Sequence, residues 1–183
     1  DCRFVTNMAG GGGAVWTDHC QVTVADCIFE RNLAVPAYDL SRPNVRIAAY
    51  GGGGAMLNYS SSVQLCTCTF KANTAGGAGA VSTAQGALFA EDCSFLYNSA
   101  GFEPGAVFNG HCVVDIARCI FVGNSADSTG AMMNISVTAS TLTNCIFAGT
   151  RGCAVSNLGS TLTIANCTIV DNRGSGVGSG GDS

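Results

Sequence analysis

Short runs of alternating apolar and polar residues recur along the whole chain. Each run holds two apolar residues separated by one position, as in Val22 and Val24 or Val114 and Ile116. Side chains two positions apart share one face of a β-strand, so each pair predicts one strand with a buried face. The other pairs are Val63 and Leu65, Leu88 and Ala90, and Leu162 and Ile164. The pattern favours short strands over helices, which would need a period of 3.6 residues.

A second motif, Cys-x-Phe-x-x-Asn-x-Ala, follows these pairs. Complete copies begin at Cys2, Cys27, Cys68, Cys93 and Cys119. Two degenerate copies begin at Cys145 and Cys167, and successive cysteines are 25, 41, 25, 26, 26 and 22 residues apart. A fixed period near 25 residues predicts a solenoid, in which each repeat packs only against its neighbours.

Each repeat has a third landmark, a small-residue step that precedes an apolar residue. It lies 13 residues before the next repeat cysteine in all copies but one, where the interval is 14. The steps are at Ala14, Ala55, Ala80, Ala106, Ala131 and Ala154. Glycine, asparagine and aspartate between the landmarks supply turns. Three short strands per coil of ~25 residues predict an all-β, parallel β-helix of about seven coils.

Equivalent positions of successive coils form columns in such a fold, with neighbours ~4.8 Å apart. We expect the phenylalanine column and the repeat-cysteine column to point inward and stack. The asparagine column should form a ladder at a turn, because side-chain amides can bond backbone groups that no strand pairs. Its members are Asn7, Asn32, Asn73, Asn98 and Asn124.

The domain organisation follows from where the repeat is interrupted. Residues 1–174 are predicted to form the β-helix, with a surface loop inserted at residues 35–50, where the longest interval carries 16 extra residues. Residues 175–183 are rich in glycine and serine and predict a flexible tail. The chain begins within a repeat, and we expect neighbouring sequence or another subunit to stack on that open edge.

Composition narrows the classes of function. Charged residues make up 11% of the chain and the net charge is −4, so no basic stripe for nucleic acid exists. No run of 18 apolar residues predicts a membrane span. We expect no cofactor, because no phosphate-binding glycine motif is present and the glycine runs precede strands rather than helices.

The chain contains 11 cysteines. Seven form the repeat column and fit a stack of small buried side chains. The other four depart from the repeat and are the better candidates for disulfides, which would indicate an oxidising compartment. They are Cys20, Cys66, Cys112 and Cys153.

The repeat resembles that of the polymorphic outer-membrane proteins, whose signature pairs the tetrads Gly-Gly-Ala-apolar and Phe-x-x-Asn. The first tetrad is intact at residues 12–15 and 53–56 and relaxed at 78–81, 104–107, 129–132 and 152–155. The second is intact in the five complete copies and lost at Thr150 and Ile169. The resemblance implies a right-handed β-helix at a cell surface, used for adhesion or as a stalk. This chain has no membrane-barrel segment, so what the family implies about a membrane barrel does not carry over to it.

A carbohydrate-active enzyme is the alternative, because pectin-degrading lyases and hydrolases share the parallel β-helix. Such an enzyme needs clustered carboxylates with a basic residue nearby. Asp26 and Asp92 occupy one column, but Thr67 separates them and Arg118 follows one coil later. A spacing of two coils, ~10 Å, is at or just beyond the upper limit for an inverting pair. We therefore predict a non-enzymatic chain, and a groove with three or more carboxylates and a basic residue would favour the enzyme.

Two further motifs suggest modification or metal binding. His19 and His111 each precede a cysteine, but three coils separate them, so they should not share a metal ion. Sequons at Asn58, Asn134 and Asn166 are candidate N-glycosylation sites. Asn58 and Asn134 share a column with Asn109 and Asn157, so this column could instead be a second internal ladder.

The outward positions of the third strand supply a candidate partner surface. They are mixed in the first four coils and become apolar in the last ones. The apolar members, termed the apolar strip, are Ile120, Val122, Ile146, Ala148 and Val170. A contiguous strip of this kind suggests contact with other protein subunits by lateral packing. The sequence thus predicts an extracellular or cell-surface structural or adhesive module, in a larger surface protein or a filament, with glycans as further candidate partners.

Overall fold

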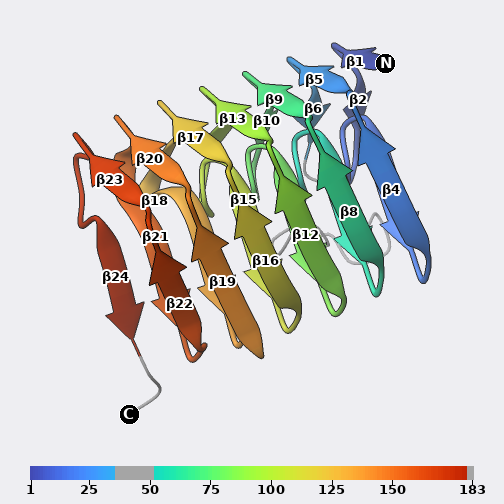
Figure 1. Cartoon of the computed structure of the whole chain (residues 1–183). Helices are drawn as coiled ribbons and strands as arrows, with labels where there is room; N and C mark the ends of the chain where they lie inside the picture. Colours follow the sequence, from blue (N-terminus) through green and yellow to red (C-terminus); the bar gives the residue numbers. More distant parts are fainter. Residues whose placement is uncertain (36–51, 181–183) are drawn as a thin grey trace, which may run out of the picture.

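The computed structural model describes residues 1–35 and 52–180, and these form an all-β solenoid of about six turns (Figure 1). Three parallel sheets run along its length, so each coil contributes strands to three faces as predicted. The strand that follows the repeat cysteine occurs seven times, whereas the strand that precedes it, which carries an apolar pair in five of its copies, occurs six times. The predicted seven coils are therefore about six full turns plus an additional strand at the start.

The seven-stranded sheet is built from the Cys–Phe segments of the repeat. Its strands pair in the order β1-β5-β9-β13-β17-β20-β23. Their bounds are β1 Arg3–Val5, β5 Ile28–Glu30, β9 Thr69–Lys71, β13 Ser94–Leu96, β17 Ile120–Val122, β20 Ile146–Ala148 and β23 Thr168–Val170. Each repeat phenylalanine pairs in register with the next, so the sequence repeat sets the register of this sheet.

The six-stranded sheet contains the apolar pairs. Its strands lie in the order β22-β19-β16-β12-β8-β4. Their bounds are β4 Gln21–Ala25, β8 Ser62–Cys66, β12 Ala87–Glu91, β16 Val113–Ala117, β19 Ala139–Thr143 and β22 Leu162–Ala165. In β8, β12 and β16 the apolar pair faces the core and the alternate residues face outward. In β19 the inward positions are Ser140 and Leu142.

The eleven-stranded sheet covers the third face. It combines the two-residue strands after each ladder asparagine with the strands after each small-residue step, and β18 and β21 span both positions. Their bounds are β2 Met8–Ala9, β3 Val15–Asp18, β6 Leu33–Ala34, β7 Met56–Tyr59, β10 Thr74–Ala75, β11 Val81–Ala84, β14 Ser99–Ala100, β15 Val107–Gly110, β18 Ser125–Ile135, β21 Arg151–Leu158 and β24 Val177–Gly180.

The core is a set of stacked columns, as predicted. Consecutive rings from Phe4 to Phe147 stack nearly parallel, with centroids 4.6–5.0 Å apart. The repeat cysteines from Cys27 to Cys145 are buried beside them. Each coil thus places a side chain of the same shape above its equivalent in the previous coil, which favours close packing.

The predicted asparagine ladder is confirmed. Asn73, for example, accepts hydrogen bonds at Oδ1 from the backbone N–H and side-chain amide of Asn32, 2.9 Å each. Its own amide donates to the Phe29 carbonyl and to Asn98. The amides thereby satisfy backbone groups at a turn between two sheets, where no strand partner exists.

Each coil has three turns, and the equivalent turn residues of successive coils form three columns. Non-glycine residues in these columns adopt a left-handed backbone conformation, with positive φ. One column contains Asp26, Thr67, Asp92 and Arg118, all with φ near +54°. This backbone conformation costs roughly 1 kcal/mol or more for a non-glycine residue. The coils above and below impose it, because each turn residue donates its N–H to the carbonyl of the next coil, as Asp92 does to Ala117.

The inserted loop and the C-terminal tail are the two predicted segments outside the regular repeat. The inserted loop at 35–50 lies outside the described residues, except for the exposed Val35. The predicted flexible tail is wrong for part of its length, because Val177–Gly180 forms β24 and pairs with β21. Backbone hydrogen bonds are sufficient to add this strand, so its glycine-rich composition does not prevent it.

Candidate functional site

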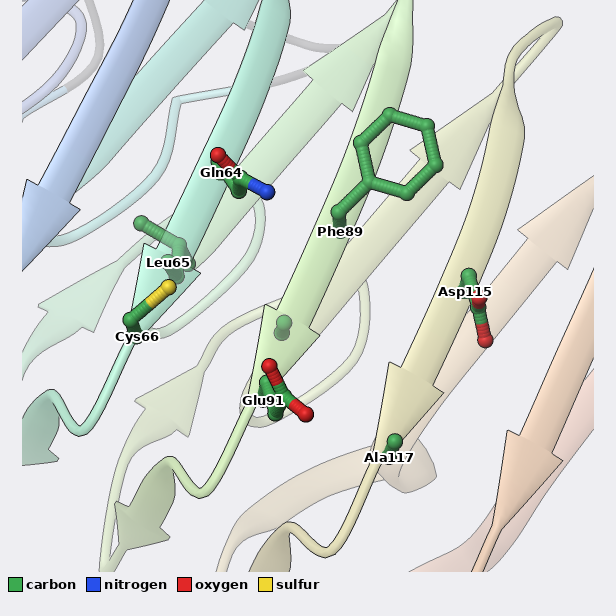
Figure 2. A pocket seen from close by; sticks show the side chains of 8 residues that line it. Gln64, Leu65, Cys66, Phe89, Glu91, Asp115 and Ala117 are labelled. Carbon is green, nitrogen blue, oxygen red and sulfur yellow. The ribbon is translucent and has the colours of Figure 1, made fainter.

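A shallow depression of about 200 Å³ lies on the outer face of the six-stranded sheet, over β8, β12 and β16 (Figure 2). We term it the Phe89 depression. Its lining residues are Gln64, Leu65, Cys66, Phe89, Ala90, Glu91, Asp115 and Ala117. These residues come from the C-terminal halves of three paired strands, whose hydrogen bonds hold the backbone beneath any ligand.

Strand register brings the lining side chains together. Phe89 is the register partner of Gln64 on one side and of Asp115 on the other. Figure 2 shows these three residues on adjacent strands, with the Phe89 ring between an amide and a carboxylate. Two positions along the strands, Glu91 lies between Cys66 and Ala117 in the same way. The result is an aromatic ring flanked by hydrogen-bonding groups.

Arg118 fixes the acidic rim of the depression. Its guanidinium donates to Asp92 at 2.9 and 3.1 Å and also to Glu91. The hydrogen bonds with Asp92, and then those with Glu91, raise the pKa of Arg118 above its ordinary value. The predicted proximity of Asp92 and Arg118 in neighbouring coils is therefore confirmed. Their pairing neutralises part of the negative charge beside Phe89.

The carboxylates around the Phe89 depression can be compared with those that a carbohydrate-active enzyme needs. That alternative calls for three or more carboxylates with a basic residue in one groove. Two carboxylates, Glu91 and Asp115, line the depression, and Asp92 lies beyond its rim in the ion pair with Arg118. Asp26 lies two coils from Asp92, as the sequence predicted, with Thr67 between them.

No group of three or more His, Cys, Asp or Glu side chains suited to a metal ion occurs within residues 1–35 and 52–180. His19 and His111 both lie in left-handed turns of the same column. His19 contacts the neighbouring Asp18 carboxylate, 2.5 Å from Nδ1 to Oδ1. The two histidines belong to the first and fourth coils of this column, as the sequence predicted.

The predicted apolar strip lies on the outer face of the seven-stranded sheet. Ile120 pairs with Ile146, and Val122 pairs with Ala148, which in turn pairs with Val170. Ile120, Ile146 and Val170 are 38%, 39% and 42% exposed. The far end of the same face is charged, because Glu30 lies among Arg3, Arg31 and Lys71 at 3.2–3.9 Å.

Two of the three candidate glycosylation sites are wrong for the folded chain. Asn58 and Asn134 are fully buried and belong to the second internal ladder. Asn58 bonds Thr17 and Thr83, and Asn134 accepts from Asn109 at 3.0 Å. A glycan cannot be attached to a side chain that the core encloses. Asn166 is exposed in a turn and stays a candidate.

The candidate disulfides are also not formed. All 11 cysteines lie in the described residues and carry free thiols. Cys20 and Cys112 share a column but are three coils apart, ~14 Å, too far for a disulfide. Cys66 and Cys153 lie on different sheets. Burial raises the pKa of Cys112 to about 12, which leaves this thiol inert at neutral pH.

Two noteworthy side chains were missed by the sequence analysis. Phe89 lies between Leu88 and Ala90, so their inward direction was a sufficient signal that Phe89 points outward. Glu103 had no such signal. It lies between β14 and β15, and its Oε2 is buried without a hydrogen-bond partner among the described residues. Burial raises the pKa of Glu103 to about 7.

Glu103 should make stability depend on pH. A carboxyl group whose pKa is raised on folding favours the folded state below its unfolded value of 4.5, and this contribution is lost as pH rises through about 7. We expect the melting temperature of the wild type to fall relative to that of Glu103→Gln between pH 4.5 and pH 8. Asp127→Asn, which changes an exposed carboxylate, serves as the control. Parallel pH profiles for wild type and Glu103→Gln would contradict this expectation.

Comparison of the chain with protein-family models, curated proteins and solved structures gave no match. The resemblance to the polymorphic outer-membrane repeat therefore stays a prediction that depends on the two tetrads. Within the described residues, no helix has the length and hydropathy needed to cross a membrane.

Proposed function

We propose that this chain is a non-enzymatic structural or adhesive module that acts outside the cell or at its surface. The observation that carries the proposal is the apolar strip, in which Ile120, Ile146 and Val170 are exposed on three adjacent strands and Val122 and Ala148 are partly exposed between them. Exposed apolar residues scattered singly need no explanation, but a contiguous patch on paired strands favours a protein partner. The partner is another protein subunit that packs laterally on this sheet.

The charged end of the same face supports this arrangement. Glu30 and its basic neighbours would set the orientation of a partner, whereas the apolar strip would supply the buried area. Interfaces of a few hundred Å² per partner are weak, so lateral association would need repetition along a filament or a surface layer. End-to-end stacking of solenoids would supply that repetition.

Extracellular placement is supported by the resemblance of the tetrads and not by disulfides. The thiols are free, and burial raises the pKa of Cys112 to about 12 and that of Cys145 to about 11. Such thiols resist oxidation because the reactive thiolate hardly forms. The buried thiols are therefore compatible with an oxidising environment without being paired.

Replacing Ile120 and Ile146 together by aspartate should abolish lateral association. Two buried, unpaired carboxylates at a small apolar interface would cost more than the interface supplies. Sedimentation velocity over a range of concentrations measures the association, and circular dichroism should show an unchanged fold because both side chains point outward. Association that persists in the double variant would contradict the proposal.

The six-stranded sheet offers a control position. Thr23 is exposed on β4, on a different face of the solenoid from the apolar strip and the charged end. Thr23→Asp adds a charge of the same sign at an outward strand position away from the proposed interface. We expect this variant to associate like the wild type, which separates loss of the apolar contact from a general effect of charge.

A further inference from the structure

We propose that the Phe89 depression binds a neutral oligosaccharide, with one pyranose ring stacked on the face of Phe89. The inference concerns the six-stranded sheet and goes beyond the proposed function, which depends on the apolar strip of the seven-stranded sheet. The two surfaces belong to different faces of the solenoid, so each can be altered without the other.

Phe89 is out of place in its column. The outward positions paired with it in successive coils are Thr23, Gln64, Asp115, Thr141 and Thr163, which are all polar. The Phe89 ring is 38% exposed between them. Strand pairing on both sides of β12 holds its backbone, so little conformational entropy would be lost when a ligand stacks on the ring.

The groups beside the ring match the chemistry of a sugar. A pyranose has a face of C–H groups, which are weakly positive and suit the negative face of an aromatic ring. Its edge carries hydroxyl groups that both donate and accept hydrogen bonds. Gln64 supplies an amide with donors and an acceptor, and Asp115 and Glu91 supply carboxylate acceptors within the same depression.

The charge distribution favours a neutral ligand. Glu91 and Asp92 are paired with Arg118, whereas Asp115 has no ion-pair partner among the described residues. Acidic sugars would therefore face uncompensated negative charge. A cationic ligand would gain little, because the attraction of one exposed carboxylate is screened by solvent.

An apolar peptide fits this surface less well. Phe89 is the single large apolar side chain in its outward column, and its register partners are an amide and a carboxylate. An apolar segment would leave those polar groups desolvated without partners, which is costly. A sugar instead satisfies both the ring and the polar groups around it.

Cys66 provides a reporter for this site within the native sequence. It lines the depression and is partly exposed, whereas Cys20 is exposed on a different turn of the coil. A bound oligosaccharide would cover Cys66 and leave Cys20 open. The alkylation rates of the two thiols, measured by mass spectrometry of peptides, therefore report occupancy with an internal control.

The test uses cellohexaose, chitohexaose and mannohexaose as neutral probes and hexagalacturonate as the acidic probe. A single stacked ring predicts a dissociation constant in the millimolar range. We expect at least one neutral probe to slow Cys66 alkylation several-fold with no change at Cys20, and hexagalacturonate to have no effect. Calorimetric titration of the same probes gives the affinity independently.

Two variants at Phe89 make the stacking requirement specific. Phe89→Ala should weaken binding at least tenfold, and Phe89→Leu should do nearly the same, because leucine keeps the bulk but not the flat ring. Tyr97→Ala, which removes an exposed aromatic ring elsewhere, should bind like the wild type. Ile120→Asp with Ile146→Asp should also keep sugar binding, so failure of the proposed function would not appear as failure here.

Three results would overturn the inference. One is the absence of binding by all three neutral probes at about 10 mM. Another is equal binding by the wild type and both Phe89 variants once circular dichroism has shown that they are folded. The third is tighter binding of hexagalacturonate than of the neutral probes.

Discussion

Replacing Phe95 by alanine should lower the free energy of unfolding by about 3–5 kcal/mol, the range for large aromatic truncations in cores. Its ring is fully buried and stacks on Phe70 at 5.0 Å and on Phe121 at 4.6 Å. Truncation would break the column in its middle, and the neighbouring coils cannot collapse into the space because their own strands fix their spacing. Urea unfolding followed by circular dichroism measures the loss.

The chain contains a matched control for this substitution. Phe89 lies six residues earlier on the outer face, so Phe89→Ala removes the same atoms from a surface position. We expect it to cost less than about 1 kcal/mol, as is usual for surface substitutions. If Phe95→Ala were no more destabilising than Phe89→Ala, the ring stack would not be the core that the structure indicates.

The fold was predictable because the repeat constrains every coil at once. A single Cys-x-Phe segment could be placed with either face inward. Several copies with the same spacing leave one consistent solution, in which Phe29, Phe70 and Phe95 stack. The ladder at Asn73 followed from the same reasoning, because a polar residue that recurs at a turn needs a repeated partner.

The errors arise where residue type was given more weight than strand periodicity. Asn58 lies two positions after Met56, so both point inward if Met56 does. The sequon nevertheless suggested a surface residue. Likewise, Cys112 departs from the repeat and suggested a disulfide, whereas the structure buries it as a small apolar side chain. Burial in the core accounts for the side chains of Asn58 and Cys112, without a glycan or a disulfide.

The candidate site was predictable in part. The proximity of Asp92 and Arg118 follows from their shared column. The ion pair that also includes Glu91 depends on side-chain conformations, which periodicity does not specify. Glu103 was beyond prediction, because its burial depends on how the segment between β14 and β15 folds over its neighbours. Solenoid repeats thus predict columns well and predict poorly what lies between them.

Replacing Asn98 by alanine should lower the free energy of unfolding by about 3 kcal/mol or more. Its amide donates to the Phe70 carbonyl and to Asn124, and its Oδ1 accepts the backbone N–H and the amide of Asn73. Asn98 is fully buried, so water cannot replace these bonds. Each buried group left unsatisfied costs about 1–3 kcal/mol, and several are left together.

The same ladder supplies two controls for Asn98→Ala. Asn7, at the exposed end of the ladder, donates to Asn32, and no described residue donates to its side-chain oxygen, so Asn7→Ala should cost less than about 1 kcal/mol. Threonine already occupies this column at Thr150, where its hydroxyl bonds Asn172 at 2.8 Å. Asn98→Thr should therefore be intermediate, because one hydroxyl replaces part of the amide. Equal losses for Asn98→Ala and Asn7→Ala would show that the buried amides contribute little, and the coils would then be held together by their strands and stacked rings alone.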